Sequence, residues 1–243
     1  LAHNLSVESF GLFYSVLSLT SLLLLFKDFG LGPALAKYLP EFQHRKEFSR
    51  LKSSVVTSYV FQMFVGIAFF LGVWHFHPYL ISDFFKTTSA TPVLLTMVIE
   101  VVVASTTVKY ALQGLQFIKS YALMELLRTL FVLASITVLL QRGVVGVALS
   151  YLIGSIAVQV IFSLYIVKKT RKMPGKAGFS MENLGMLSRF GIYFLLASMA
   201  GFLIAYTDTI VLTALRSLEE VGLYQVAIST SQVLWGVALA LSV

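Results

Sequence analysis

The chain has 243 residues, of which 58% are hydrophobic and only 12% are charged, and its net charge is +7. Soluble domains carry about twice this share of charged residues, so the composition excludes an ordinary water-soluble core. Apolar runs of about 20 residues, the length that crosses a bilayer core as a helix, recur along the chain. The sequence therefore predicts an all-α, polytopic helical membrane bundle.

About seven apolar runs are long enough to be expected as transmembrane helices. In chain order they cover residues 10–26, 55–74, 92–112, 121–140, 144–167, 190–215 and 221 to the end. The chain begins at Leu1 rather than at a methionine, and its last apolar run still continues at Val243. We therefore expect this sequence to be a fragment of a longer protein.

Basic residues alternate between the connections that join these runs. In chain order the connecting regions hold five, one, three, one, six and one lysine or arginine. Cytoplasmic connections of membrane proteins carry the excess of these residues. The alternation predicts a multi-pass protein of the cytoplasmic (inner) cell membrane, with the N-terminus of this sequence outside. It also explains the basic balance without a nucleic-acid partner.

The stretch "KKTRKMPGK" is the strongest candidate for a domain boundary, because proline, glycine and lysine gather in it. We expect residues 1–173 to form a first transmembrane lobe without its first helix, 174–189 a cytoplasmic linker with an amphipathic segment, and 190–243 the start of a second lobe. Ser180 is the expected N-cap of the amphipathic segment. The stretch "EFQHRKEFSRLKSS" is either a second helix lying flat at the headgroup boundary or a solvated connector.

Two stretches far apart in the chain are similar. They are "SVESFGLFYSVLS", which begins at Ser6, and "SLEEVGLYQVAIS", which begins at Ser217; Ser, Glu, Gly, Leu and Ser recur at the same offsets. Six expected spans separate them, so both enter the membrane from the same side, as in a parallel repeat of a transporter. The repeat predicts one more span before Leu1 and about five after the seventh run.

Three segments of the sequence carry motifs of a known kind. In chain order they are "VESFGLFYSVLSLTSLLLLFKDFGLGPALAKYLPEF", "YALQGLQFIKSYALMELLRTL" and "YTDTIVLTALRSLEEVGLYQVA". They resemble the second helix region, the fourth-to-fifth helix hairpin and the second-lobe entry of polysaccharide and oligosaccharide-lipid flippases, which belong to the multidrug/oligosaccharidyl-lipid/polysaccharide exporter superfamily. The matching residues are Glu8, Gly11, Phe13, Asp28, Gly30, Gly32, Lys37, Tyr38, Gly114, Tyr121, Glu125, Asp208, Glu219, Gly222, Tyr224 and Ala227.

The resemblance implies two lobes of six or more helices that face each other across a central cavity and work by alternating access. It implies that a glycan on a polyprenyl or dolichyl (di)phosphate is flipped from the inner to the outer leaflet for surface polysaccharide or glycan assembly. The expected partners are this lipid-linked glycan, the lipid bilayer, and a glycan polymerase or glycosyltransferases.

We expect neither enzymatic activity nor a cofactor or metal. The four histidines all fall in connections, and the sequence contains no glycine-rich phosphate loop or nucleophile motif. Two alternatives stay open. One is a cation-coupled multidrug-type antiporter of the same superfamily, and the other, from a different class, is a membrane glycan polymerase or ligase.

Charged residues inside expected spans are candidates for function. Glu100, near the middle of the third span, is a candidate site for a coupling proton or cation, or else a protonated side chain bonded to another helix. Lys109 is expected on the opposite face of the same helix, where it cannot pair with Glu100. Arg128 either pairs with Glu125, three residues earlier, or presents its planar fork to a lipid-linked phosphate.

The end of the first span is expected to be broken. Gly30 and Gly32 interrupt the helix, and Pro33 suits a restart at a first helical position. Broken helices line binding sites in transporters, so these three residues are the expected hinge.

Beside this hinge we expect a basic vestibule that collects an anionic lipid headgroup. Its headgroup-binding residues are Lys27, Lys109 and Arg128. The expected coupling, cavity or gate residues are Asp28, Glu100, Glu125 and Asp208. For Asp208, a contact that satisfies a neighbouring helix is favoured over a place in the cavity.

Overall fold

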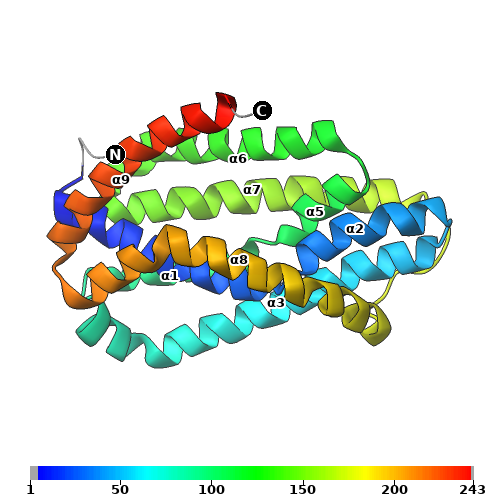
Figure 1. Ribbon diagram of the computed structural model, residues 1–243, viewed down its shortest axis with the longest axis horizontal. Coiled ribbons are helices and arrows are strands. Elements are labelled where there is room, and N and C mark those ends of the chain that lie inside the picture. Colours follow the sequence, from blue (N-terminus) through cyan, green and yellow to red (C-terminus); the bar gives the residue numbers. More distant parts are fainter. Residues whose placement is uncertain (1–4, 242–243) are drawn as a thin grey trace.

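The computed structural model describes the backbone of residues 5–241 and the side chains of residues 5–231, and this part of the chain is helical, without strands (Figure 1). The helices are α1 Val7–Asp28, α2 Leu31–His44, α3 Phe48–Tyr79, α4 Ala90–Val103, α5 Thr106–Gly114, α6 Ile118–Leu139, α7 Gly143–Arg171, α8 Met181–Leu215 and α9 Leu218–Leu241, with a short π-helix η1 Leu80–Phe84 and a 3-10 turn η2 Leu140–Arg142. The predicted all-α membrane bundle is confirmed.

Within residues 5–241, five helical stretches are long and apolar enough to cross a membrane. They are Val7–His44, Phe48–Phe84, Ala90–Gly114, Ile118–Arg171 and Met181–Leu215. The fourth stretch contains both α6 and α7, which fold back on each other at η2 and at Gly143, whose φ is 62°. The protein is therefore a multi-pass membrane protein, and the number of seven spans stays a prediction.

The helices lie roughly along the long axis of the molecule (Figure 1). The N end of the bundle, on the left in Figure 1, gathers the start of α1, the end of α8 and the start of α9. The linker end, on the right, gathers α2, the start of α3, residues 172–180 and the start of α8. Between the two ends α1 packs against α8, α4 and α7, so α1 is the central helix of the bundle.

The first expected span is a discontinuous helix. α1 ends at Asp28 and α2 begins at Leu31, and Gly30 between them has a φ of 70°. Gly30 also lies against the backbone of Gly191 in α8, where a Cβ atom would collide. Pro33 is the third residue of α2 rather than the expected first. It fits there because the third N–H of a helix also lacks an intrahelical partner.

The third expected span is broken as well, and the prediction of one continuous helix there is wrong. α4 ends at Val103, Ala104 is extended with a ψ of 120°, and α5 begins at Thr106. Ser105 caps α5, because its hydroxyl accepts a hydrogen bond of 3.3 Å from the N–H of Thr107. Lys109 therefore lies on a different helix from Glu100. The spacing that would put the two side chains on opposite faces of one helix does not apply to them.

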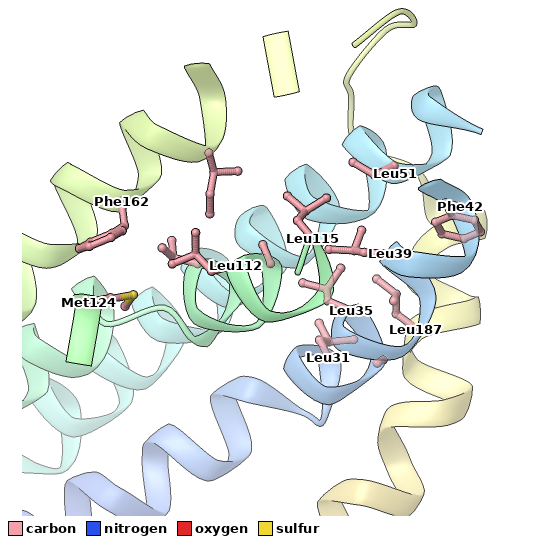
Figure 2. Close-up of a cluster of buried hydrophobic side chains, with 14 of the residues drawn as sticks. Leu31, Leu35, Leu39, Phe42, Leu51, Leu112, Leu115, Met124, Phe162 and Leu187 are labelled. Carbon is pink, nitrogen blue, oxygen red and sulfur yellow. The ribbon is translucent and has the colours of Figure 1, made fainter. Parts of the chain in front are cut away.

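A cluster of buried apolar side chains holds the linker end together (Figure 2). It joins the short helices α2 and α5 to α3, α6, α7 and α8. Figure 2 shows Leu31, Leu35, Leu39, Phe42, Leu51, Leu112, Leu115, Met124, Phe162 and Leu187. Phe42 and Leu51 are buried in it, and only residues 45–47 separate α2 from α3. Neither of the two alternatives for this stretch, a flat interfacial helix or a solvated connector, is what the structure shows, because Phe42 and Leu51 pack inside the bundle at the end of α2 and the start of α3.

The segment before α8 is tied to the start of α3. The ammonium of Lys52 donates hydrogen bonds to the carbonyls of Met173, at 2.7 Å, and Gly175, at 3.0 Å. Ser180 accepts a hydrogen bond from the N–H of Asn183, as expected of an N-cap. α8 then runs unbroken to Leu215, so the amphipathic segment and the sixth span form one helix.

Candidate functional site

A cavity of about 210 Å³ opens beside the break between α4 and α5. Four charged side chains from α4, α5 and α6 line it, namely Glu100, Lys109, Glu125 and Arg128. Its other lining residues are Leu24, Ala104, Ser105, Thr106, Met124, Ser155, Val158 and Gln159. The structure thus brings four of the candidate residues into one place, which we call the charged pocket.

The four charges of the pocket form two ion pairs between helices. Lys109 Nζ lies 2.8 Å from Glu125 Oε1, and Arg128 Nη2 lies 3.7 Å from Glu100 Oε1. The expected pair within α6, between Arg128 and Glu125, is not what the structure shows. Each of these two side chains meets an opposite charge on another helix instead.

Glu100 is the most deeply buried of these groups, with 3% of its side chain exposed. Besides Arg128, it accepts a hydrogen bond of 2.6 Å from the hydroxyl of Ser155 in α7. The side chain of Arg128 is 42% exposed, and those of Lys109 and Glu125 are 37% and 40% exposed. The basic groups are therefore reachable from the cavity, whereas one carboxylate is enclosed.

Lys27 is not part of the charged pocket. It is 1% exposed, and its ammonium donates to the backbone carbonyls of Val101 at 2.5 Å, Val102 at 3.0 Å and Ala104 at 2.5 Å. These three bonds use all the hydrogens of the ammonium group. Of the three cations expected in the vestibule, Lys109 and Arg128 line the charged pocket, whereas Lys27 does not line it and is bonded to these carbonyls instead.

Asp28 links the break between α1 and α2 to the break between α4 and α5. One oxygen of its carboxylate accepts hydrogen bonds from the N–H of Gly32, at 3.1 Å, from the amide of Gln62, at 2.9 Å, and from the hydroxyl of Thr106. The carboxylate thus sits at the N-terminal ends of both α2 and α5, where a negative charge is favoured by the helix dipole. A Cβ atom on Gly32 would collide with the ring of Tyr110, so glycine at this position allows α2 and α5 to approach.

Uncharged polar residues, which the sequence motifs did not predict, complete this site. The hydroxyl of Ser105 donates to the amide oxygen of Gln62 at 2.8 Å, and the amide of Gln159 donates to the carbonyl of Ser105 at 2.8 Å. Both glutamines are at least nine-tenths buried inside apolar helices. A glutamine in a membrane span is the signal that could have identified them, because an unsatisfied amide is costly there.

Asp208 lies elsewhere, near the N end of the bundle. Its carboxylate accepts hydrogen bonds from the hydroxyl of Tyr224 in α9 and, at 2.7 Å, from the N–H of Thr209. It does not line the charged pocket. Among the described residues, no group of three or more acids, histidines or cysteines is placed to hold a metal ion.

The fold and this pocket define a helical membrane protein with a charged cavity beside a broken helix. The sequence profile of a family described as polysaccharide biosynthesis protein matches residues 1–242. The chain belongs to this family, which confirms the assignment predicted from the three motifs.

A comparison with curated proteins finds an uncharacterized membrane protein of Methanocaldococcus jannaschii, 26% identical over 242 residues. The alignment covers 92% of this chain and 48% of the relative, so the chain spans about half the length of this relative. No solved structure matches the chain.

Proposed function

We propose that the protein helps to move an oligosaccharide, linked to a polyprenyl or dolichyl (di)phosphate, from the inner to the outer leaflet of the cell membrane. The observation that carries the proposal is the charged pocket, in which Lys109 and Arg128 reach a cavity inside the bundle of a polysaccharide biosynthesis protein. A phosphate leaving water needs compensating charge, and the guanidinium fork of an arginine matches phosphate oxygens in two places.

Before the substrate binds, Glu125 and Glu100 neutralise the two cations of the pocket. A phosphate headgroup would therefore bind by exchange, taking the place of a carboxylate beside each cation. Glu100 keeps the hydrogen bond from Ser155 after such an exchange, while Glu125 is exposed enough to be solvated. Lys109 and Arg128 can thus turn from their carboxylate partners to the phosphate, and neither carboxylate is left wholly unsatisfied.

We also propose an orientation and a division into lobes. The basic connections at the linker end face the cytoplasm, and the N end faces outside, because cytoplasmic segments carry the lysine and arginine excess. Residues 1–173 belong to the first lobe, and α8 and α9 begin the second. A glycan polymerase or glycosyltransferases would act on the same lipid-linked glycan at the two sides of the membrane.

The test is translocation of a lipid diphosphate carrying a labelled sugar in liposomes that contain the complete natural protein. We expect Arg128→Gln and Lys109→Gln each to lower the rate by a factor of about 10 to 100, since a hydrogen bond to a charged group is worth about 1.5–3 kcal/mol. Lys119→Gln is the matched control, because Lys119 lies on α6, is exposed, and does not line the pocket.

A rate unchanged in both pocket variants would contradict the proposal. A second arm adds a lipophilic cation as a competitor. If the cation, and not the lipid diphosphate, is transported and its transport requires Glu100, the multidrug-type antiporter is the better description.

A further inference from the structure

Three backbone carbonyl oxygens converge on the ammonium of Lys27. In a continuous helix the carbonyls of Val101 and Val102 would accept from the N–H groups of the residues four positions later. The break at Ala104 removes these partners, and Lys27 replaces them from α1 at 2.5 and 3.0 Å. The carbonyl of Ala104 itself completes the set at 2.5 Å.

Such a set of carbonyls is a cation site by its chemistry. The C-terminal end of a helix carries a partial negative charge. In transporters with broken helices, unwound carbonyls and the C-terminal ends of half-helices hold coupling cations. The same backbone feature occurs at the end of α4, and a lysine from α1 occupies it.

The surroundings of Lys27 are shaped for its side chain. Gly66 of α3 borders the stem, since a Cβ atom there would lie 3.2 Å from Lys27 Cε and 3.2 Å from the Cα of Val102. The next residue, Asp28, bonds Thr106 on the other side of the same break. One dipeptide therefore supplies a positive charge to the end of α4 and a negative charge to the start of α5.

We propose that Lys27 is a tethered cation: its ammonium fills a monovalent-cation site formed by the carbonyls at the end of α4, and removing the side chain opens that site to a small free cation. The native protein needs no dissolved cation at this point to hold the broken helix beside the charged pocket. This inference is independent of the substrate proposed above.

The experiment compares thermal unfolding of the wild-type protein, Lys27→Ala and Lys27→Met in detergent. Each is measured in choline, sodium, potassium and methylammonium chloride at equal ionic strength. We expect Lys27→Ala to melt lower than wild type in choline and to gain at least about 2 °C from a small cation, with methylammonium included, in a concentration-dependent way. Wild type and Lys27→Met, whose apolar side chain fills the space of the stem, should not respond.

Equal responses of the three proteins to every salt, or a Lys27→Ala variant as stable as wild type in choline, would overturn the proposal. If Lys27→Ala does not fold, Gly66→Ala tests the same site with the lysine kept. We expect Gly66→Ala to melt lower than wild type, and Gly72→Ala on the same helix, where a Cβ atom meets nothing within 4 Å, to melt no lower. Equal melting temperatures for these two variants would also overturn it. The readout is stability, so failure here leaves the proposed transport function untouched.

Discussion

The ion pair between Arg128 and Glu100 is unequal, because the arginine is 42% exposed and the glutamate only 3%. Removing Arg128 leaves a buried carboxylate with Ser155 as its remaining near partner. We expect Arg128→Gln to lower the free energy of unfolding by about 1–3 kcal/mol. Glu100→Gln should cost less, because its amide oxygen still accepts the hydrogen bond from Ser155. Denaturant unfolding in detergent measures both values.

A double-mutant cycle isolates the pair. If the two side chains interact as the structure shows, the variant with both substitutions should lose less stability than the sum of the single losses. Strict additivity would mean that Arg128 and Glu100 do not interact in the folded protein.

The pair between Lys109 and Glu125 is closer, at 2.8 Å, but both side chains are more than a third exposed. Solvent screening reduces the contribution of such pairs to stability. We expect Lys109→Gln to change the free energy of unfolding by less than about 1 kcal/mol while it slows the proposed transport. A loss of stability as large as that of Arg128→Gln would show that Lys109 supports the fold instead of contacting the substrate.

Among the elements, one helix break was predicted and the other was not. Gly30 and Gly32 mark the first break locally. The positive φ of Gly30 and its contact with the Gly191 backbone favour glycine, and a Cβ atom on Gly32 would collide with the Tyr110 ring. The partners that hold the second break, Lys27 and Asp28, come from a different helix. The local signals there are the β-branched residues before Ala104 and the capping Ser105, and neither is strong enough to outweigh the length of the largely apolar run 92–112.

In the charged pocket, too, local sequence predicted which residues take part and did not predict their partners. Spacing along the sequence placed Glu100, Lys109, Glu125 and Arg128 in membrane helices, and all four line the cavity. The pairing between them depends on where α5 and α6 lie relative to α4 in the folded bundle, and α5 and α6 are held in place by the apolar cluster of the linker end. Local spacing favoured a pair within α6, and packing selected two pairs between helices.

The corner between α1 and α2 depends on glycine at position 30. Its φ of 70° and its contact with the Gly191 backbone both disfavour a side chain. We expect Gly30→Ala to lower the free energy of unfolding by about 2–4 kcal/mol. Gly201→Ala in α8 is the control, because a Cβ atom there meets nothing within 4 Å; it should be neutral or stabilising by up to about 1 kcal/mol. Similar losses in both variants would show that the corner is not the cause.

At the scale of the whole molecule, the two similar sequence stretches lie against each other at the N end. A Cβ atom on Gly11 of α1 would collide with the carbonyl of Leu218, and one on Gly222 of α9 with the carbonyl of Val7. The shared glycine of the two copies thus lets α1 and α9 approach closely. Beside them, Lys86 donates a 2.9 Å hydrogen bond to the carbonyl of Ala214 at the end of α8. The first and second lobes, as we propose them, are in contact at this end.

A disulfide can test whether this contact must open during the transport that we propose. The hydroxyls of Ser15 in α1 and Thr213 in α8 are 2.7 Å apart and buried, and the sequence contains no cysteine. We expect Ser15→Cys with Thr213→Cys to form one cross-link on oxidation, because side-chain atoms this close are within reach of a disulfide. Ser15→Cys with Thr137→Cys is the control, since Thr137 is exposed on α6, which packs on α7.

If alternating access separates α1 from α8 at the N end, the cross-linked protein should stop translocating the lipid diphosphate in liposomes, and a reducing agent should restore the rate. The control pair should neither cross-link nor change the rate. If the cross-linked protein transports as fast as the same variant after treatment with the reducing agent, α1 and α8 move as one body. The next contact to cross-link would then be the one between α1 and α9, where Gly11 and Gly222 allow the close approach.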